Sequence, residues 1–326
     1  MTLLTTSNLG IGAANFNAGA NSVALTAAGV SGALNTGTLT AGALNLNLTN
    51  GAIASTLNTS VTSITGVSAG PLTIQEASGL QIGAAGLSVT SGNLSINAVG
   101  LIDLNTLNGN LTTSGANAMT LNGAGVDGTG QTITTGALTL AGAGTFTVSG
   151  SFSSVTTAGA LAGGNVAVTN TSGGLLTANN FNAGVQQLTI SSNGGLSTLG
   201  TLGAGSLAVT GSGGAFTINT NATTIAAQTS GGVLTFTTAG AVTVGTVNGV
   251  AGLNAGANNL VLNSAGGAVL SQGGGANTIS ATGLALTGSL AANLNNAGNN
   301  VGTIASSATG SLLYADVDTL TVGTVQ

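Results

Sequence analysis

The chain has 326 residues, of which 42% are hydrophobic and 2% are charged, and its formal net charge is −5. It contains no Lys, Arg, His or Cys, and its acidic residues are Glu76, Asp103, Asp127, Asp316 and Asp318. With only five carboxylates and no His, Lys or Cys, most routes to general-base, nucleophilic or metal catalysis are closed. We therefore expect no enzyme, and no catalytic, cofactor-binding or metal-binding residue.

The missing basic residues also restrict the partners. Nucleic-acid binding depends on Lys and Arg side chains that neutralise phosphates, so nucleic acid is excluded as a ligand. No apolar run reaches the roughly 18 residues that a membrane-spanning helix needs. We expect neither nucleic-acid binding nor a membrane span.

Trypsin should leave this chain intact, both folded and unfolded, because trypsin cleaves after Lys and Arg and the sequence has neither. The measurement is gel electrophoresis after digestion with and without urea. Elastase, which cleaves after small aliphatic residues, is the control and should degrade the urea-unfolded chain. A trypsin-specific fragment would contradict the prediction.

The composition predicts a folded chain with a thin aliphatic core. Disordered chains are usually poor in apolar residues and rich in charge, and this chain is the opposite. Aromatic residues make up only 2% of it. Disulfides are ruled out by the absence of Cys, so stability must come from backbone hydrogen bonds and stacked aliphatic side chains.

Short segments in which apolar and small residues alternate recur along the whole chain. This alternation is typical of strands with one buried face, and the Gly, Asn and Ser residues between them favour turns. No segment has the periodicity of an amphipathic helix, so an all-β chain is predicted. In chain order, the predicted strands are 44–48, 72–74, 87–89, 94–96, 138–140, 146–148, 166–168, 188–190, 207–209, 216–218, 242–244, 260–262, 284–286 and 320–322.

Three segments align without gaps. Gly70–Gly83 reads GPLTIQEASGLQIG, Gly232–Gly245 reads GVLTFTTAGAVTVG, and Gly310–Gly323 reads GSLLYADVDTLTVG. The spacing predicts a super-repeat of about 80 residues with copies near 64–83, 225–247 and 304–325.

Repetition of short, closely spaced strands favours a parallel β-helix, or β-solenoid, over a propeller, a helical solenoid or an ordinary sandwich. Parallel crossovers favour a right-handed coil. With coils of about 20 residues stacked about 4.8 Å apart, residues 1–326 would form one continuous rod of roughly 16 coils and 80 Å. The start lacks the features of a signal peptide, and the end follows a strand-like motif directly. We therefore expect a fragment of a longer repeat protein.

The segment Asn299–Val325, NNVGTIASSATGSLLYADVDTLTVGTV, resembles the repeats of filamentous-haemagglutinin-type exoproteins, which are bacterial β-strand-repeat surface proteins secreted by a two-partner route. Its first part, Ile304–Gly310, has a counterpart in Ile64–Gly70. The sequence LTLAG at Leu138–Gly142 is also typical of these repeats. The resemblance implies a right-handed β-helix, an outer-membrane transporter as secretion partner for the parent protein, and a role in adhesion or matrix building.

Two acidic residues, Asp316 and Asp318, offer oxygens on one face of a strand, which is part of what a Ca²⁺ ion needs. The equivalent positions in the other copies carry Glu76-Ala-Ser78 and Thr238-Ala-Gly240. The acidic pair is therefore not a feature of the repeat. A solvated turn is favoured, with Ca²⁺ binding left open, and the isolated Asp103 and Asp127 are also assigned to turns.

Two functions fit these features. The first is a non-enzymatic extracellular rod at the cell surface, acting as a stalk, an adhesin segment, or a filament or biofilm-matrix subunit. It would associate with itself end to end or side by side, or bind a cell-surface or glycan ligand. The alternative is an ice- or carbohydrate-binding solenoid with a flat Thr/Asn face, although Thr145-Phe-Thr147 and Thr235-Phe-Thr237 are irregularly spaced. A continuous two-column array of outward Thr would favour the alternative, and a mixed Ser/Asn/Ala face the first.

Overall fold

The computed structural model describes residues 1–10, 15–30, 37–264, 269–288 and 291–325. In these ranges the chain is an all-β parallel solenoid of about 15 turns with no helix. The predicted fold class is confirmed, and the number of turns is close to the number expected, while the right-handedness stays a prediction. No helix in the described ranges is long and apolar enough to cross a membrane.

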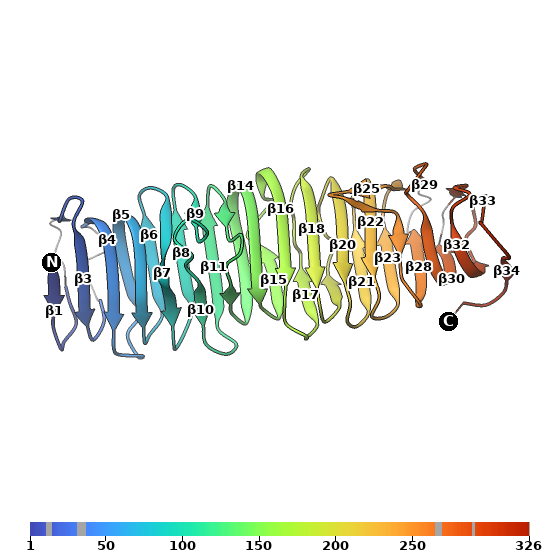
Figure 1. The fold of residues 1–326 in the computed structure, drawn as a ribbon. Coiled ribbons are helices and arrows are strands. Elements are labelled where there is room, and N and C mark those ends of the chain that lie inside the picture. Colours follow the sequence, from blue (N-terminus) through green and yellow to red (C-terminus); the bar gives the residue numbers. More distant parts are fainter. Residues whose placement is uncertain (11–14, 31–36, 265–268, 289–290, 326) are drawn as a thin grey trace. The chain divides into compact units, whose positions relative to one another are not determined.

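The chain divides into two compact units, Met1–Gly164 and Asn165–Gln326. Within each unit, strands of successive coils pair side by side, and the colour order of Figure 1 follows this stacking. The strands that begin in the first unit are β1 (Thr2–Leu4), β2 (Phe16–Asn17), β3 (Ser22–Ala27), β4 (Leu39–Leu48), β5 (Ser55–Ser68), β6 (Leu72–Glu76), β7 (Leu80–Val89), β8 (Leu94–Ala98), β9 (Ile102–Asp103), β10 (Leu111–Thr113), β11 (Ala118–Gly123), β12 (Val126–Asp127), β13 (Ile133–Thr134), β14 (Ala137–Ser151), β15 (Ser154–Thr157) and β16 (Ala162–Asn170).

The second unit continues with the same kind of short strand. Each predicted strand falls within an observed one, apart from Leu320, which precedes β34. The strands of this unit are β17 (Leu176–Asn179), β18 (Gln187–Ser192), β19 (Leu196–Leu199), β20 (Ser206–Gly211), β21 (Phe216–Thr220), β22 (Thr224–Thr229), β23 (Leu234–Thr238), β24 (Val242–Val244), β25 (Thr246–Val247), β26 (Val250–Ala251), β27 (Leu253–Asn254), β28 (Asn259–Ser264), β29 (Val269–Gln272), β30 (Ile279–Gly288), β31 (Ala291–Leu294), β32 (Asn300–Ser306), β33 (Leu312–Tyr314) and β34 (Thr321–Val322).

Ladders of aliphatic side chains form the core of each unit. Parallel pairing in register places the same strand position of each coil above its equivalent in the next, and alternate residues point inward. One ladder of the first unit consists of Leu72, Leu94, Met119, Leu138 and Val155, all buried. One ladder of the second unit consists of Leu176, Leu196, Phe216, Leu234, Leu260 and Leu284, all buried.

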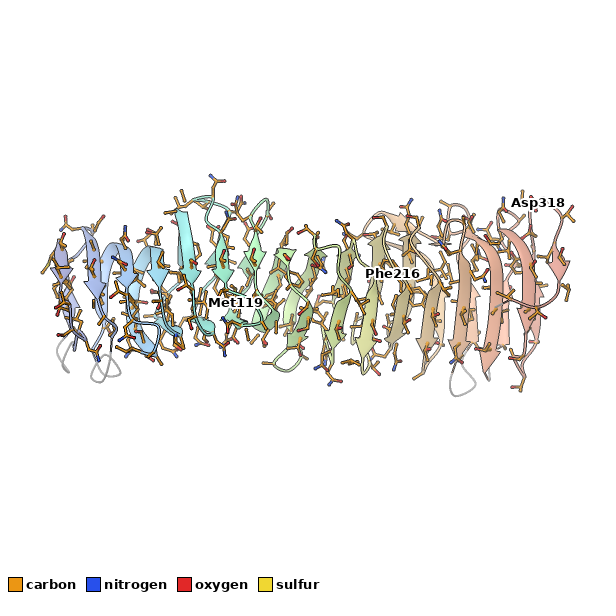
Figure 2. All side chains as sticks on the ribbon, turned by 90° about the horizontal axis from the view of Figure 1, so that it is seen from below. Met119, Phe216 and Asp318 are labelled. Atoms are coloured by element: carbon orange, nitrogen blue, oxygen red, sulfur yellow. The ribbon has the colours of Figure 1, made fainter. Side chains whose placement is uncertain are left out.

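Figure 2 shows the contrast between the core and the surface. Met119 and Phe216 lie within the body of their units, whereas Asp318 lies on the outside. Because each coil is narrow, a single Phe occupies the place that Leu holds in the coils on either side. The scarcity of aromatic residues follows from this geometry.

The three aligned copies occupy equivalent places in the pairing. In each copy, an Ile in the lead-in is the register partner of the aliphatic residue near the end of the motif. The pairs are Ile64–Ile82, Ile225–Val244 and Ile304–Val322.

The β25–β26 hairpin departs from the parallel pattern. Its strands pair antiparallel, with Thr246 opposite Ala251 and Val247 opposite Val250. Asn248 and Gly249 form the two-residue turn with φ of 49° and 80°. Positive φ at both positions is what a type I′ turn requires, and Asn-Gly is the preferred sequence for it.

Candidate functional site

Two columns of outward polar side chains run along the first unit. Residues two apart on a strand share a face, so the two columns lie beside each other. The hydroxyl column consists of the register partners Thr56, Thr73, Ser95, Thr120, Thr139 and Thr156. The amide column consists of Asn58, Gln75, Asn97 and Asn122.

A groove of about 420 Å³ lies over the amide column and is lined by all of its side chains. The described residues that line it include no aromatic side chain and one acidic residue, Glu76. Val99 at the groove is 75% exposed. The rest of the lining comes from Thr38, Thr59, Ala77 and Ala98.

The amides of the groove are partly bonded to one another. Asn122 donates from Nδ2 to Oδ1 of Asn97 at 3.3 Å, and Asn97 donates from Nδ2 to Oγ of Ser95 at 3.2 Å. A side-chain amide has two donor hydrogens and an oxygen with two lone pairs. The two bonds fix the orientation of these amides and leave donor and acceptor capacity for a ligand.

Glu76 is 3% exposed and its carboxylate is occupied by structural hydrogen bonds. It accepts from the backbone N–H of Val61 at 3.3 and 3.1 Å. It also accepts from the N–H and the hydroxyl of Ser78 at 3.1 and 2.9 Å. The carboxylate thus joins a turn to the strand of the preceding coil.

Asp316 makes the same kind of connection in the third copy of the repeat. It accepts from the N–H of Val301 at 3.1 Å, from the N–H of Asp318 at 3.2 Å and from the hydroxyl of Tyr314 at 2.7 Å. Burial and the neighbouring Asp316 carboxylate raise the pKa of Tyr314. Asp316 therefore organises a turn, while Asp318 is exposed. No three His, Cys, Asp or Glu side chains of the described residues come together as metal ligands.

Asp103 and Asp127 are not isolated in space, contrary to the prediction, because they are register partners on adjacent coils. Both have turn roles: Asp103 accepts from the N–H of Thr106 at 2.9 Å, and Asp127 accepts from the N–H of Thr129 at 3.1 Å. Hydrogen bonds from Thr129 hold the pKa of Asp127 below its usual value. Asn105 also donates to Asp127 at 3.2 Å.

The outward Thr residues form a mixed array. The partner of Thr147 is Asp127, and Thr145 lies beside it on β14. Thr235 continues a hydroxyl column of the second unit, which Val261 then ends. A two-column array of Thr is therefore not formed at either Thr-x-Thr segment, and the second column of the first unit consists of amides.

The β25–β26 hairpin, which was not predicted from the sequence, covers an outward patch of the second unit. Val247 packs on Ala208 and Ala226, and all three are at most 1% exposed. Asn248 donates from Nδ2 to the hydroxyl of Thr189 at 3.2 Å. The hairpin therefore ties together β18, β20 and β22. Asn248-Gly249 between two valines is a sequence signal for such a hairpin, whereas the repeat alignment predicts only that a copy ends near Val247.

Replacing Val247 with Ser should destabilise the second unit by about 1–2 kcal/mol, because it removes a fully buried valine from the patch. The measurement is urea unfolding followed by circular dichroism, with backbone hydrogen exchange to locate the effect around β20 and β22. Val185→Ser is the matched control, since Val185 is 87% exposed. Equal effects from the two substitutions would mean that the hairpin contributes nothing.

Comparison of the chain with protein-family models, with curated proteins and with solved structures found no match. The resemblance to filamentous-haemagglutinin-type repeats therefore stays a prediction. The fold itself is a β-solenoid of about 15 turns.

Proposed function

We propose that the chain is a non-enzymatic structural or adhesive segment of a secreted protein at the cell surface. The observation that carries the proposal is that the outward columns of the first unit are uncharged. The carboxylates of Glu76 and Asp316 instead accept hydrogen bonds from backbone N–H groups of neighbouring coils. Such a molecule is suited to act as a structural element and to present binding surfaces.

Stacking explains why an uncharged surface suits this role. Equivalent side chains repeat about every 4.8 Å along a column. Two like charges at about that distance repel by about 1 kcal/mol even in water, and the penalty would recur at each coil. Thr, Ser, Asn and Gln avoid it and offer hydrogen bonds instead.

The proposed partners follow from the same surface. Other copies of the chain are one class, associating end to end or side by side. A cell-surface or glycan ligand is the second. The resemblance to filamentous-haemagglutinin-type repeats adds an outer-membrane transporter that would export the parent protein.

The test is to display the chain on a non-adherent bacterial carrier and to measure attachment to host-cell and glycan-coated surfaces, together with electron microscopy of the purified protein. Attachment or filament formation above that of the empty carrier is expected. A folded chain that neither attaches nor assembles would contradict the proposal. So would turnover of a substrate that is lost on replacing Asp103, Asp127 or Asp316 with Asn.

A further inference from the structure

We infer that the groove over the amide column of the first unit binds a neutral, polyhydroxylated chain, namely an uncharged oligosaccharide lying along the two columns. This inference rests on the proposed adhesive function and names the class of ligand that one of its surfaces would hold.

The charge of the groove selects against ionic ligands. The chain has no Lys, Arg or His to pair with an anion. Glu76 is the acidic residue of the lining, and it is buried and already accepts hydrogen bonds from Val61 and Ser78. A cation would have to compete with those bonds, whereas a neutral ligand would leave them intact.

The hydrogen-bonding groups match hydroxyl groups. Each sugar hydroxyl both donates and accepts, and so does each side-chain amide. Gln75 is exposed in the middle of the column, and Asn97 and Asn122 are held in place by the bonds between them. Preorganised groups lose less conformational entropy on binding than mobile ones.

The spacing of the columns supports a ligand that lies along them. Each coil of the amide column presents one amide and one hydroxyl, and the pattern repeats at the strand spacing of about 4.8 Å. A sugar ring in an extended chain advances by a similar distance, so that successive rings meet equivalent side chains. The exposed Val99, together with Ala77 and Ala98, offers an apolar surface for the C–H face of a ring.

The two adjacent columns offer a narrow polar strip that fits a slender ligand lying along them. Without an aromatic ring among the described lining residues, the groove lacks an aromatic stacking surface. A single site should therefore be weak, with a dissociation constant of about 1 mM, and useful attachment would come from many copies acting together.

The experiment is an NMR titration of the full chain with three neutral hexasaccharides: cellohexaose, mannohexaose and laminarihexaose. The side-chain NH₂ signals of Gln75, Asn97 and Asn122 should shift with at least one of them. Gln75→Ala should weaken that binding by about five-fold, in keeping with the loss of a hydrogen bond. Asn47→Ala, which changes an exposed amide outside the groove, should leave it unchanged, and circular dichroism checks that both variants are folded.

Absence of shifts with all three sugars would overturn the inference. Equal weakening by Gln75→Ala and Asn47→Ala would overturn it too, as would tighter binding of hexagalacturonate, an anionic hexasaccharide. Shifts of the same amides on raising the protein concentration alone would assign the groove to a second copy. If attachment of the displayed chain survives while sugar binding is absent, only the inference falls. If attachment and assembly also fail, the proposed function falls with it.

Discussion

Replacing Asn299 with Ala is expected to lower the free energy of unfolding of the second unit by about 3–5 kcal/mol, because it leaves several buried backbone groups without a partner. The Asn299 side chain is completely buried. Its Oδ1 accepts from the N–H of Ile279 at 2.8 Å, and its Nδ2 donates to the carbonyls of Leu294 and Ala315 at 3.0 and 3.1 Å. A single side chain thus satisfies backbone groups from three separate segments.

The matched control is the neighbouring Asn300→Ala, since the Asn300 side chain is exposed and its loss should change stability by less than about 0.5 kcal/mol. Unfolding in urea, followed by far-ultraviolet circular dichroism, compares the two variants. Hydrogen exchange should show the loss of protection concentrated at the N–H of Ile279, which loses its acceptor. Similar midpoints for Asn299→Ala and Asn300→Ala would show that the buried bonds do not stabilise the unit.

Phe216→Ala should destabilise the second unit by about 3–5 kcal/mol through the cavity that it leaves. Phe216 is completely buried and is the register partner of Leu196 on one side and Leu234 on the other. Backbone hydrogen bonds hold the coil spacing on both sides, so the neighbouring coils cannot close over the gap. Collapse would require breaking the ladder.

Thr217→Ala is the control for Phe216→Ala, because Thr217 lies next to it on β21 and faces outward. Solenoids need not unfold in one step, so the urea curves should be read together with residue-level hydrogen exchange. The expected pattern is a loss of protection in β19, β21 and β23. A fully folded Phe216→Ala variant with an unchanged urea midpoint would contradict the prediction.

The fold could be predicted because strand alternation is recorded directly in the sequence. Leu188-Thr-Ile190, for example, shows which residues of β18 face inward, and the pattern needs no knowledge of the neighbouring coil. The aligned copies then indicated a repeat protein. The scarcity of charged and aromatic residues was consistent with the narrow, stacked coils of a solenoid.

The groove could not be predicted because it depends on register. Asn58, Gln75, Asn97 and Asn122 form a column only through pairing between coils whose turns differ in length. Nothing in the sequence marks how many turn residues separate one amide from the next. Pairing between coils also places Asp103 beside Asp127.

The role of Asn299 was hidden for a related reason. It belongs to a run rich in Asn, where Asn295 and Asn300 are exposed and Asn299 is buried. Burial here is decided by partners from other coils, namely Ile279 and Gln272. Residue type alone does not separate a structural amide from a surface amide.

The β25–β26 hairpin has a consequence for how the second unit loses its structure. A solenoid held only by contacts between adjacent coils can fray one coil at a time from an end, since its stability is a sum of nearest-neighbour terms. The hairpin couples coils that are not adjacent, because Asn248 reaches Thr189 on β18 while Val247 covers Ala208 and Ala226. Fraying that arrives at these coils must release them together. The hairpin thus converts part of a one-dimensional stack into a cooperative block that resists unravelling.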